Sequence, residues 1–195
     1  MNLVELTEAP DSALPVARLK EHLRLGTGFS DDDLQEPLLA AFLRAAIAAI
    51  EGRTGKALLR RRFELTLSAW TRPGRQPLPL APVASLVSVA LVPASGPEIA
   101  LPPDALRLDA DAQRPALVGP LPSIPHGGTA RVIFEAGYGP AWSDLPADLA
   151  QAVLMLAAHY HEYRHDTALG PGCTPFGVSA LIDRYRPIRL GRDAE

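Results

Sequence analysis

Proline placement constrains this chain more than any other feature of its sequence. Fourteen of the 20 prolines fall between Pro73 and Pro146. A proline inside a helix removes a backbone hydrogen bond and clashes with the preceding turn, so most of this region cannot be helical. Long helices must therefore lie on either side of a central segment of another kind.

Between the prolines, apolar and polar residues alternate with the period of two that a half-buried strand requires. In residues 63–70, for example, Phe63 and Leu65 fall on one face and Glu64 and Thr66 on the other. The predicted strands are Phe63–Trp70, Ser85–Val92, Leu106–Asp109, Ala116–Val118 and Thr129–Ala136. We therefore expect a small antiparallel sheet within residues 63–136.

Three helices are predicted around this sheet, at about residues 16–25, 31–53 and 146–165. Gly26 and Gly28 would end the first helix, and Ser30 would cap the second. Pro37 lies late for a first turn, so a kink or a start near Glu36 is an alternative for the second helix. The predicted fold class is α+β, a mainly helical frame with a small proline-rich antiparallel β insertion between the second and third long helices.

The second predicted helix is apolar around most of its circumference. Its apolar residues are Leu34, Leu38, Leu39, Phe42, Leu43, Ala46, Ile47 and Ile50. Only a stripe through Arg44 and Glu51 is clearly polar. Such a helix must be buried on several sides, either at the centre of its own core or against another subunit.

We expect the chain to divide into three segments: an N-terminal extension (1–15), one domain (16–165) and a C-terminal arm (166–195). The arm begins with a glycine- and proline-rich break, and a short helix then places Val178, Leu181, Ile182 and Tyr185 at helical spacing, before a run of arginines. A helix this short needs a surface to fold on. That surface belongs either to another protein or to the chain's own domain, and the sequence leaves both open.

The net charge of −3 is close to neutral. A protein that holds nucleic acid through its phosphates generally has a basic stripe, so tight, sequence-independent DNA binding is not expected. Cys173 is the only cysteine, which excludes an internal disulfide and a thiolate zinc cluster. The longest apolar helical run, Ala152–Ala158, is far shorter than the roughly 20 residues that span a bilayer, so no membrane contact is expected.

The one motif that suggests catalysis is His161-Glu162-x-x-His165. Two histidines four residues apart can bind one zinc ion from a helix, with the glutamate as general base, which defines a zinc hydrolase as the alternative function. A third ligand is needed; no histidine follows the motif, and the distant acidic candidates are Asp183 and Glu195 in the C-terminal tail. We therefore interpret these residues as the polar end of a helix and predict no catalytic residue, no metal and no cofactor.

Arg60, Arg61 and Arg62 form the densest cationic run, directly before the first predicted strand. They are candidates for contact with DNA or with an acidic partner. A solvated turn is the simpler interpretation of such a triplet.

Five segments in order form a further pattern: Leu19-x-x-His22-Leu23-Arg24, Ile50-Glu51-x-x-Thr54-Gly55-Lys56-Ala57-Leu58, Leu80-x-Pro82-Val83-x-Ser85-Leu86-x-Ser88-Val89, Phe134-Glu135-Ala136-Gly137-Tyr138-Gly139, and Leu145-Pro146-x-x-Leu149-x-x-Ala152 followed by His159-Tyr160-x-Glu162-x-Arg164. In these segments, over about Val16 to Arg164, the chain resembles the head-to-tail connector (adaptor, or head completion) proteins of tailed phages and gene transfer agents.

The resemblance implies a structural protein of the particle neck that is not an enzyme and is assembled in the bacterial cytoplasm. Its copies would form a ring, usually dodecameric, that binds the portal protein and presents a surface to a stopper or tail-side neck protein. Double-stranded DNA would pass through the lumen without specific binding. The arm would then dock on the portal, with candidates Phe176, Val178, Leu181, Ile182, Tyr185 and Arg186; the subunit-interface candidates are Leu39, Leu43, Ile47 and Tyr160.

Overall fold

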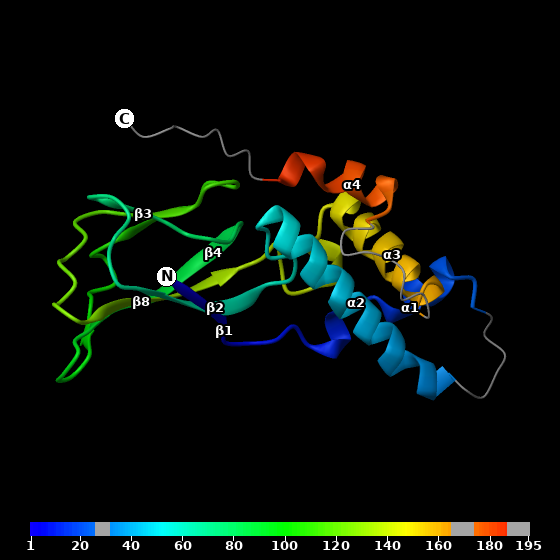
Figure 1. Cartoon of the computed structure of the whole chain (residues 1–195), viewed down its shortest axis with the longest axis horizontal. Helices are drawn as coiled ribbons and strands as arrows, with labels where there is room; N and C mark the ends of the chain where they lie inside the picture. Colours follow the sequence, from blue (N-terminus) through cyan, green and yellow to red (C-terminus); the bar gives the residue numbers. More distant parts are fainter. Residues whose placement is uncertain (26–31, 165–173, 187–195) are drawn as a thin grey trace. The chain divides into compact units, whose positions relative to one another are not determined.

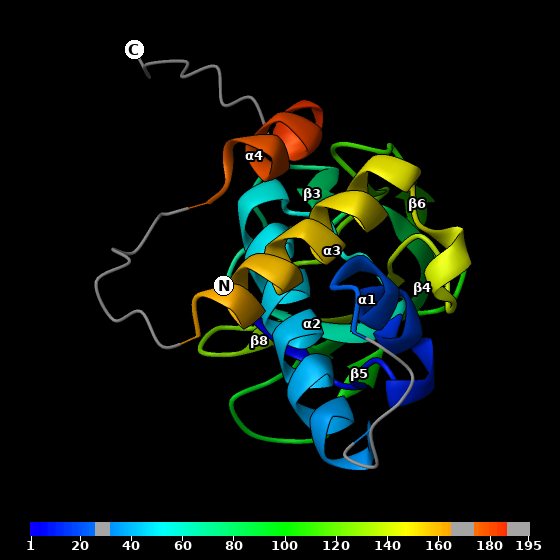
Figure 2. The same cartoon turned by 90° about the vertical axis from the view of Figure 1, so that its right-hand side faces the viewer.

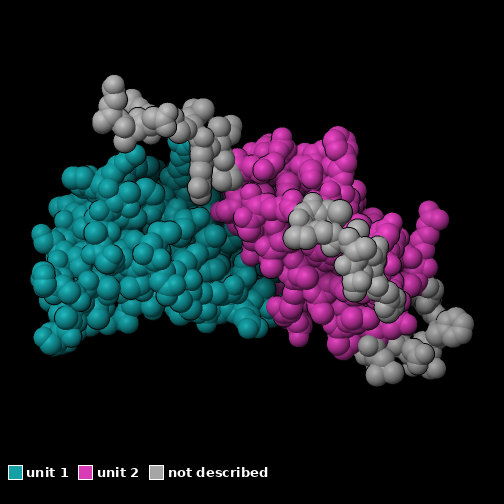
Figure 3. Space-filling model, viewed as in Figure 1, with its two compact units in different colours: residues 1–10, 57–144 teal, residues 11–56, 145–195 magenta. Residues whose placement is uncertain are grey.

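The computed structural model describes residues 1–25, 32–164 and 174–186, which form two compact units (Figure 3). Unit 1 combines residues 1–10 with 57–144, and unit 2 combines 11–56 with the part after 144. Unit 1 holds two antiparallel sheets, and unit 2 holds the α-helices (Figure 1). The predicted α+β class is confirmed.

Unit 1 is built on a five-stranded antiparallel sheet. Its strands, in spatial order, are β1 (Asn2–Glu5), β2 (Arg61–Leu67), β8 (Thr129–Ala136), β4 (Val83–Val92) and β5 (Ile99–Ala100). The alternation seen in the sequence sets which face is buried. Phe63 lies opposite Phe134 and Leu65 opposite Val132, all on the buried face.

A second sheet has three strands in the order β3 (Arg75–Pro77), β7 (Ala116–Val118) and β6 (Arg107–Asp109). Leu106 and Leu117 join the side chains of the larger sheet in one apolar core. The predicted strands 116–118 and 129–136 match the structure, and the other three differ by a few residues at their ends. Strands β1, β3 and β5, of four, three and two residues, were not predicted from the sequence.

Residues 1–10, expected to belong to an N-terminal extension, contribute the edge strand β1. Leu3 lies opposite Leu65 of β2, and the Leu6 amide donates to the Arg62 carbonyl at 2.8 Å. Arg61 Nη1 also contacts Glu5 Oε2 at 2.9 Å. The strand is therefore held by both backbone and side-chain contacts to β2.

The Gly137-Tyr138-Gly139 segment, one of the family-like motifs, is a structural junction at the end of β8. Gly137 has φ +132°, and a Cβ added there would lie 2.5 Å from Arg60 Cα. A Cβ on Gly139 would overlap the Asp144 side chain, whose Oδ2 accepts the Ala141 amide at 2.9 Å. Gly137 is thus required by close packing of backbone, and Gly139 by the Asp144 side chain packed against it.

Unit 2 contains α1 (Val16–His22), α2 (Asp32–Thr54), α3 (Ala147–Glu162) and α4 (Phe176–Ile182), with 3-10 turns η1 (Asp11–Ala13) and η3 (Asp183–Tyr185). A third 3-10 turn, η2 (Trp142–Asp144), closes unit 1. In Figure 2, α3 crosses α2, and α1 and α4 lie along α3.

The helix limits differ from the predicted ones for local reasons. Helix α1 stops at His22, because Arg24 adopts a left-handed conformation with φ 56° before either glycine is reached. Helix α2 continues through Pro37, which removes a single backbone donor near its start. Helix α3 follows Pro146 as predicted and ends at Glu162. Ser30, Gly26 and Gly28 lie outside the described residues, as does His165.

No helix in the described part of the chain is long and apolar enough to cross a membrane.

Candidate assembly surfaces

Helix α4 packs on α3 within unit 2, which decides between the two predictions for the arm. Val178 and Ile182 are fully buried, and a Cβ added to Gly177 would lie 2.7 Å from the Met155 methyl group of α3. The arm therefore folds back on its own helices as far as residue 186. Its break, including Cys173, and its last residues from 187 lie outside the described residues.

A polar cluster fixes the end of this segment. Tyr185 Oη donates to Asp148 Oδ1 at 2.8 Å, and Arg184 Nη2 lies 2.9 Å from Asp148 Oδ2. The Arg184 guanidinium stacks over the Tyr185 ring, 4.7 Å from its centroid, and also contacts its hydroxyl. Burial raises the pKa of Tyr185 above 10.0. This cluster was not predicted, because Asp148 and Tyr185 are 37 residues apart along the chain.

The candidate portal-docking residues consequently fall into three groups, which are covered, exposed and half-buried. Val178, Ile182 and Tyr185 are covered within the chain, so a role as free docking residues must be corrected for these three. Phe176 is 87% exposed, and Arg186 is also exposed. Leu181 is half-buried. The accessible docking candidates are therefore at the two ends of the α4–η3 segment.

Helix α2 has one buried and one exposed apolar face. Leu39, Leu43 and Ile47, the predicted interface residues, are buried in the chain itself, which leaves them no surface for a neighbouring subunit and corrects that prediction. Leu38 is 46% exposed and starts a stripe of exposed residues. The stripe continues through Ala41, Ala45, Ala48 and Gly52. Its spacing alternates between three and four residues, as on one side of a helix.

Tyr160, the fourth interface candidate, is half-buried near the end of α3. Its ring lies 6.4 Å from the ring of His159, which in turn lies 4.7 Å from that of Tyr163. Tyr160 therefore keeps part of its surface exposed, and its role at an interface stays a prediction.

The three arginines before β2 have different surroundings. Arg61 pairs with Glu5 and stacks on Phe63 at 5.4 Å, and its side chain is only 10% exposed, so it acts in the fold. Arg62 Nη2 donates to Glu135 Oε1 at 3.0 Å, and this bond lowers the pKa of Glu135 below 4.5. Arg60 is exposed. Of the triplet, Arg60 is therefore the best placed to contact DNA or a partner.

The zinc motif has no supporting geometry in the described residues. The His161 ring meets the Phe42 ring edge-on, with centroids 6.0 Å apart, and burial is the main reason that the pKa of His161 lies below 6.5. No group of three or more His, Cys, Asp or Glu side chains suited to a metal occurs among residues 1–25, 32–164 and 174–186. His161 is thus placed as a packing residue of the α2–α3 contact.

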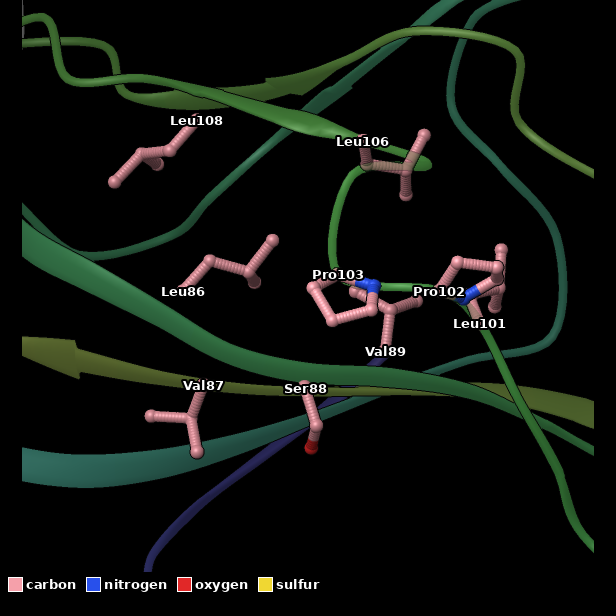
Figure 4. Close-up of a pocket in the computed structure, with 9 residues that line it drawn as sticks. All are labelled: Leu86, Val87, Ser88, Val89, Leu101, Pro102, Pro103, Leu106 and Leu108. Atoms are coloured by element: carbon pink, nitrogen blue, oxygen red, sulfur yellow. The ribbon is translucent and has the colours of Figure 1, made fainter.

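A small apolar pocket opens in unit 1 beside β4 (Figure 4). Its volume is about 260 Å³, below the roughly 300–1,000 Å³ typical of small-molecule sites. Its lining residues are Leu86, Val87, Ser88, Val89, Leu101, Pro102, Pro103, Leu106 and Leu108. Figure 4 shows Leu86 on the side of β4 that faces Leu106 and Leu108, and Val87 and Ser88 on the other side. With no charged lining residue, the pocket suits an apolar side chain.

No protein-family model and no curated protein matches this chain. Solved structures do match it. A chain in the neck of an empty gene transfer agent (GTA) particle, computed with C6 symmetry, is 50% identical, with a TM-score of 0.90 and 98% of both chains covered. The chain belongs to the neck proteins of gene transfer agent particles. The family resemblance noted from the sequence is thereby confirmed.

Two further GTA structures contain similar chains. One is the virion of a native GTA particle, with 50% identity and a TM-score of 0.87; the other is a native neck computed with C12 symmetry, with 46% identity and a TM-score of 0.83. Each match covers 98% of this neck protein and 98% of the other chain. Membership of this family implies a structural role in the particle and not an enzymatic one.

Proposed function

We propose that this neck protein forms an oligomeric ring that binds the portal vertex, extends the DNA channel and presents a surface to the next neck or tail protein. The observation that carries this proposal is the near-complete match to chains from GTA necks that have C6 and C12 symmetry. Assembly would take place in the bacterial cytoplasm, before or during completion of the particle.

Portal binding is assigned to the exposed residues of the α4–η3 segment, above all Phe176. A large, exposed aromatic side chain is the kind of group that anchors a protein interface when a partner pocket covers it. Arg186, also exposed, would add polar contacts at the rim. Val178 and Ile182 support this surface from beneath, because they hold α4 on α3.

Subunit contacts in unit 2 are assigned to the exposed stripe of α2 that begins at Leu38. Small side chains at Ala41, Ala45 and Ala48 allow a neighbouring element to approach closely. The sequence had indicated an apolar face in excess of what one core needs, and this stripe is an exposed side of α2 among residues 35–54.

DNA would pass through the ring without being held. A near-neutral protein neutralises few phosphates and releases few counterions, so it does not bind the duplex tightly. Arg60 is the candidate for a transient contact. Binding to a short duplex at low salt, compared between the wild-type protein and Arg60→Ala, would measure its contribution.

The decisive experiment mixes the purified protein with its portal and examines the product by electron microscopy and co-sedimentation. We expect a ring on the portal for the wild-type protein, loss of attachment for Phe176→Ala, and wild-type attachment for Ala180→Ser, an exposed control on α4. Leu38→Glu should prevent ring closure, whereas Gln35→Glu on the same helix should not. Absence of any ring with the wild-type protein would refute the proposed function.

A further inference from the structure

The exposed large apolar side chains of unit 1 gather at the two edges of the five-stranded sheet. Met1, Val4 and Leu6 lie in or beside β1, and Val4 and Leu6 are each 44% exposed. At the other edge, Val87 of β4 is 44% exposed and Ile99 of β5 is 52% exposed. Among the described residues of this unit, no large apolar side chain elsewhere belongs to the exposed class.

Half of strand β4 has a free edge. Strand β8 pairs with β4 from Val83 to Val92, but β5 pairs only with Ala90 and Leu91 on the other side. No strand in the described part of the chain pairs with that second side over residues 83–88. Unpaired backbone groups in a strand edge are a template for another strand. The apolar pocket lies against this same stretch, since Leu86 and Val89 line it.

Strand β1 has dimensions and chemistry that fit this edge. It spans four residues and pairs only with β2, so its outer side is open among the described strands. Leu3 and, by alternation, Met1 point to one face of the sheet, and Val4 and Leu6 to the other. Strands β1 and β4 run in opposite directions within the sheet, because three successive antiparallel pairings separate them.

A ring places different demands on a subunit than a two-fold dimer does. Each subunit of a cyclic ring meets its two neighbours through two different, complementary surfaces. Two apolar edges on opposite ends of one sheet satisfy that requirement, and two identical patches would not. Because β5 pairs only with Ala90 and Leu91, the open stretch of β4 at residues 83–88 is long enough for the four residues of β1.

We propose that β1 of one subunit packs along residues 83–88 of β4 in the next subunit, so that the five-stranded sheets continue from copy to copy around the ring. Met1 would lie on the side of the pocket lined by Leu86 and Leu106, and Val4 on the side of Val87. The proposal rests on the proposed ring and adds which surfaces close it.

Cysteine cross-linking in assembled necks tests this contact. In a Cys173→Ser background, Val4→Cys and Val87→Cys are combined in one chain, and particles or portal-bound rings are treated with a short bismaleimide. We expect loss of the monomer band and a ladder of covalent oligomers up to the full ring. Each single-cysteine variant should stay monomeric, and so should Val4→Cys combined with Gln113→Cys, whose second site lies in the exposed loop after β6.

Electron microscopy of the same samples separates the two levels of the proposal. Rings that are present while the Val4–Val87 pair gives no more cross-linking than the Gln113 control overturn the sheet contact and leave the ring intact. Absence of rings in all samples, including the cysteine-free parent, overturns the ring and the contact together. As a second readout, Val4→Lys and Val87→Glu should each reduce incorporation into necks, and their combination should recover it.

Discussion

The burial of Ile182 makes a strong prediction about the C-terminal segment, because an arm that served only for docking would not stabilise the domain. Ile182 is 2% exposed on the face of α4 that packs in unit 2. Replacing it by alanine removes three carbon atoms, worth about 0.8 kcal/mol each when buried, or about 2.4 kcal/mol. The cavity left behind brings the expected loss to about 2–5 kcal/mol.

The assay is urea unfolding followed by the helical circular dichroism signal. With a slope of roughly 1–3 kcal/mol per molar urea, Ile182→Ala should lower the midpoint by about 1 M or more. Phe176→Ala is the matched control, because its side chain is 87% exposed and its loss should change stability by no more than about 0.5 kcal/mol. Phe176→Ala should nevertheless weaken portal attachment.

The two variants therefore separate stability from docking within a single seven-residue helix. A wild-type urea midpoint for Ile182→Ala would refute the reasoning, since α4 would then contribute nothing to unit 2. Equal destabilisation by Phe176→Ala would also refute it, because an exposed side chain cannot leave a cavity.

Three further predictions concern the fold. Because burial lowers the pKa of His161 below 6.5, its neutral form is favoured in the folded state. The stability that this provides is fully present above pH 6.5 and is lost as the pH falls. In His161→Phe, the urea midpoints measured at pH 7.5 and 5.5 should therefore lie closer together than they do in the wild-type protein. Gly137→Ala should destabilise unit 1 by more than about 1 kcal/mol, because the new Cβ meets the Arg60 backbone at φ +132°, and a wild-type melting temperature would contradict this. Arg61→Ala should release β1 from its ion pair with Glu5 and speed hydrogen exchange of the Leu6 amide, which donates to the Arg62 carbonyl, whereas Arg60→Ala, at an exposed position, should leave that exchange unchanged.

Much of the local structure followed from the sequence. The prolines excluded long helices from the middle of the chain, and the alternation in residues 129–136 gave the limits of β8 correctly. Pro146 marked the start of α3, because proline is tolerated at the beginning of a helix but not in its interior. These features depend on each residue's own backbone preference and on its near neighbours, and both are written in the sequence.

The assembly surfaces were less accessible to such reasoning. The excess of apolar residues in α2 was recognised, but Leu39, Leu43 and Ile47 were chosen for the outer face, and the structure buries them and exposes Leu38. Helical periodicity shows which residues share a face, but it does not show which of two apolar faces the same chain will cover. Strand β1 and the open edge of β4 were likewise missed, because each depends on which strands become neighbours.

The sequence by itself determined where strands and helices can form, which family the chain resembles, and that more apolar surface exists than one small core requires. The tertiary structure decided where that surplus lies: α4 turned back onto α3, and the apolar groups left over are at Phe176, along α2 and at the two sheet edges. The physical reason is that hydrophobic burial is non-directional. The sequence pattern predicts which side chains favour burial. Only the folded structure determines which other residues, of the same chain or of a neighbouring subunit, cover them.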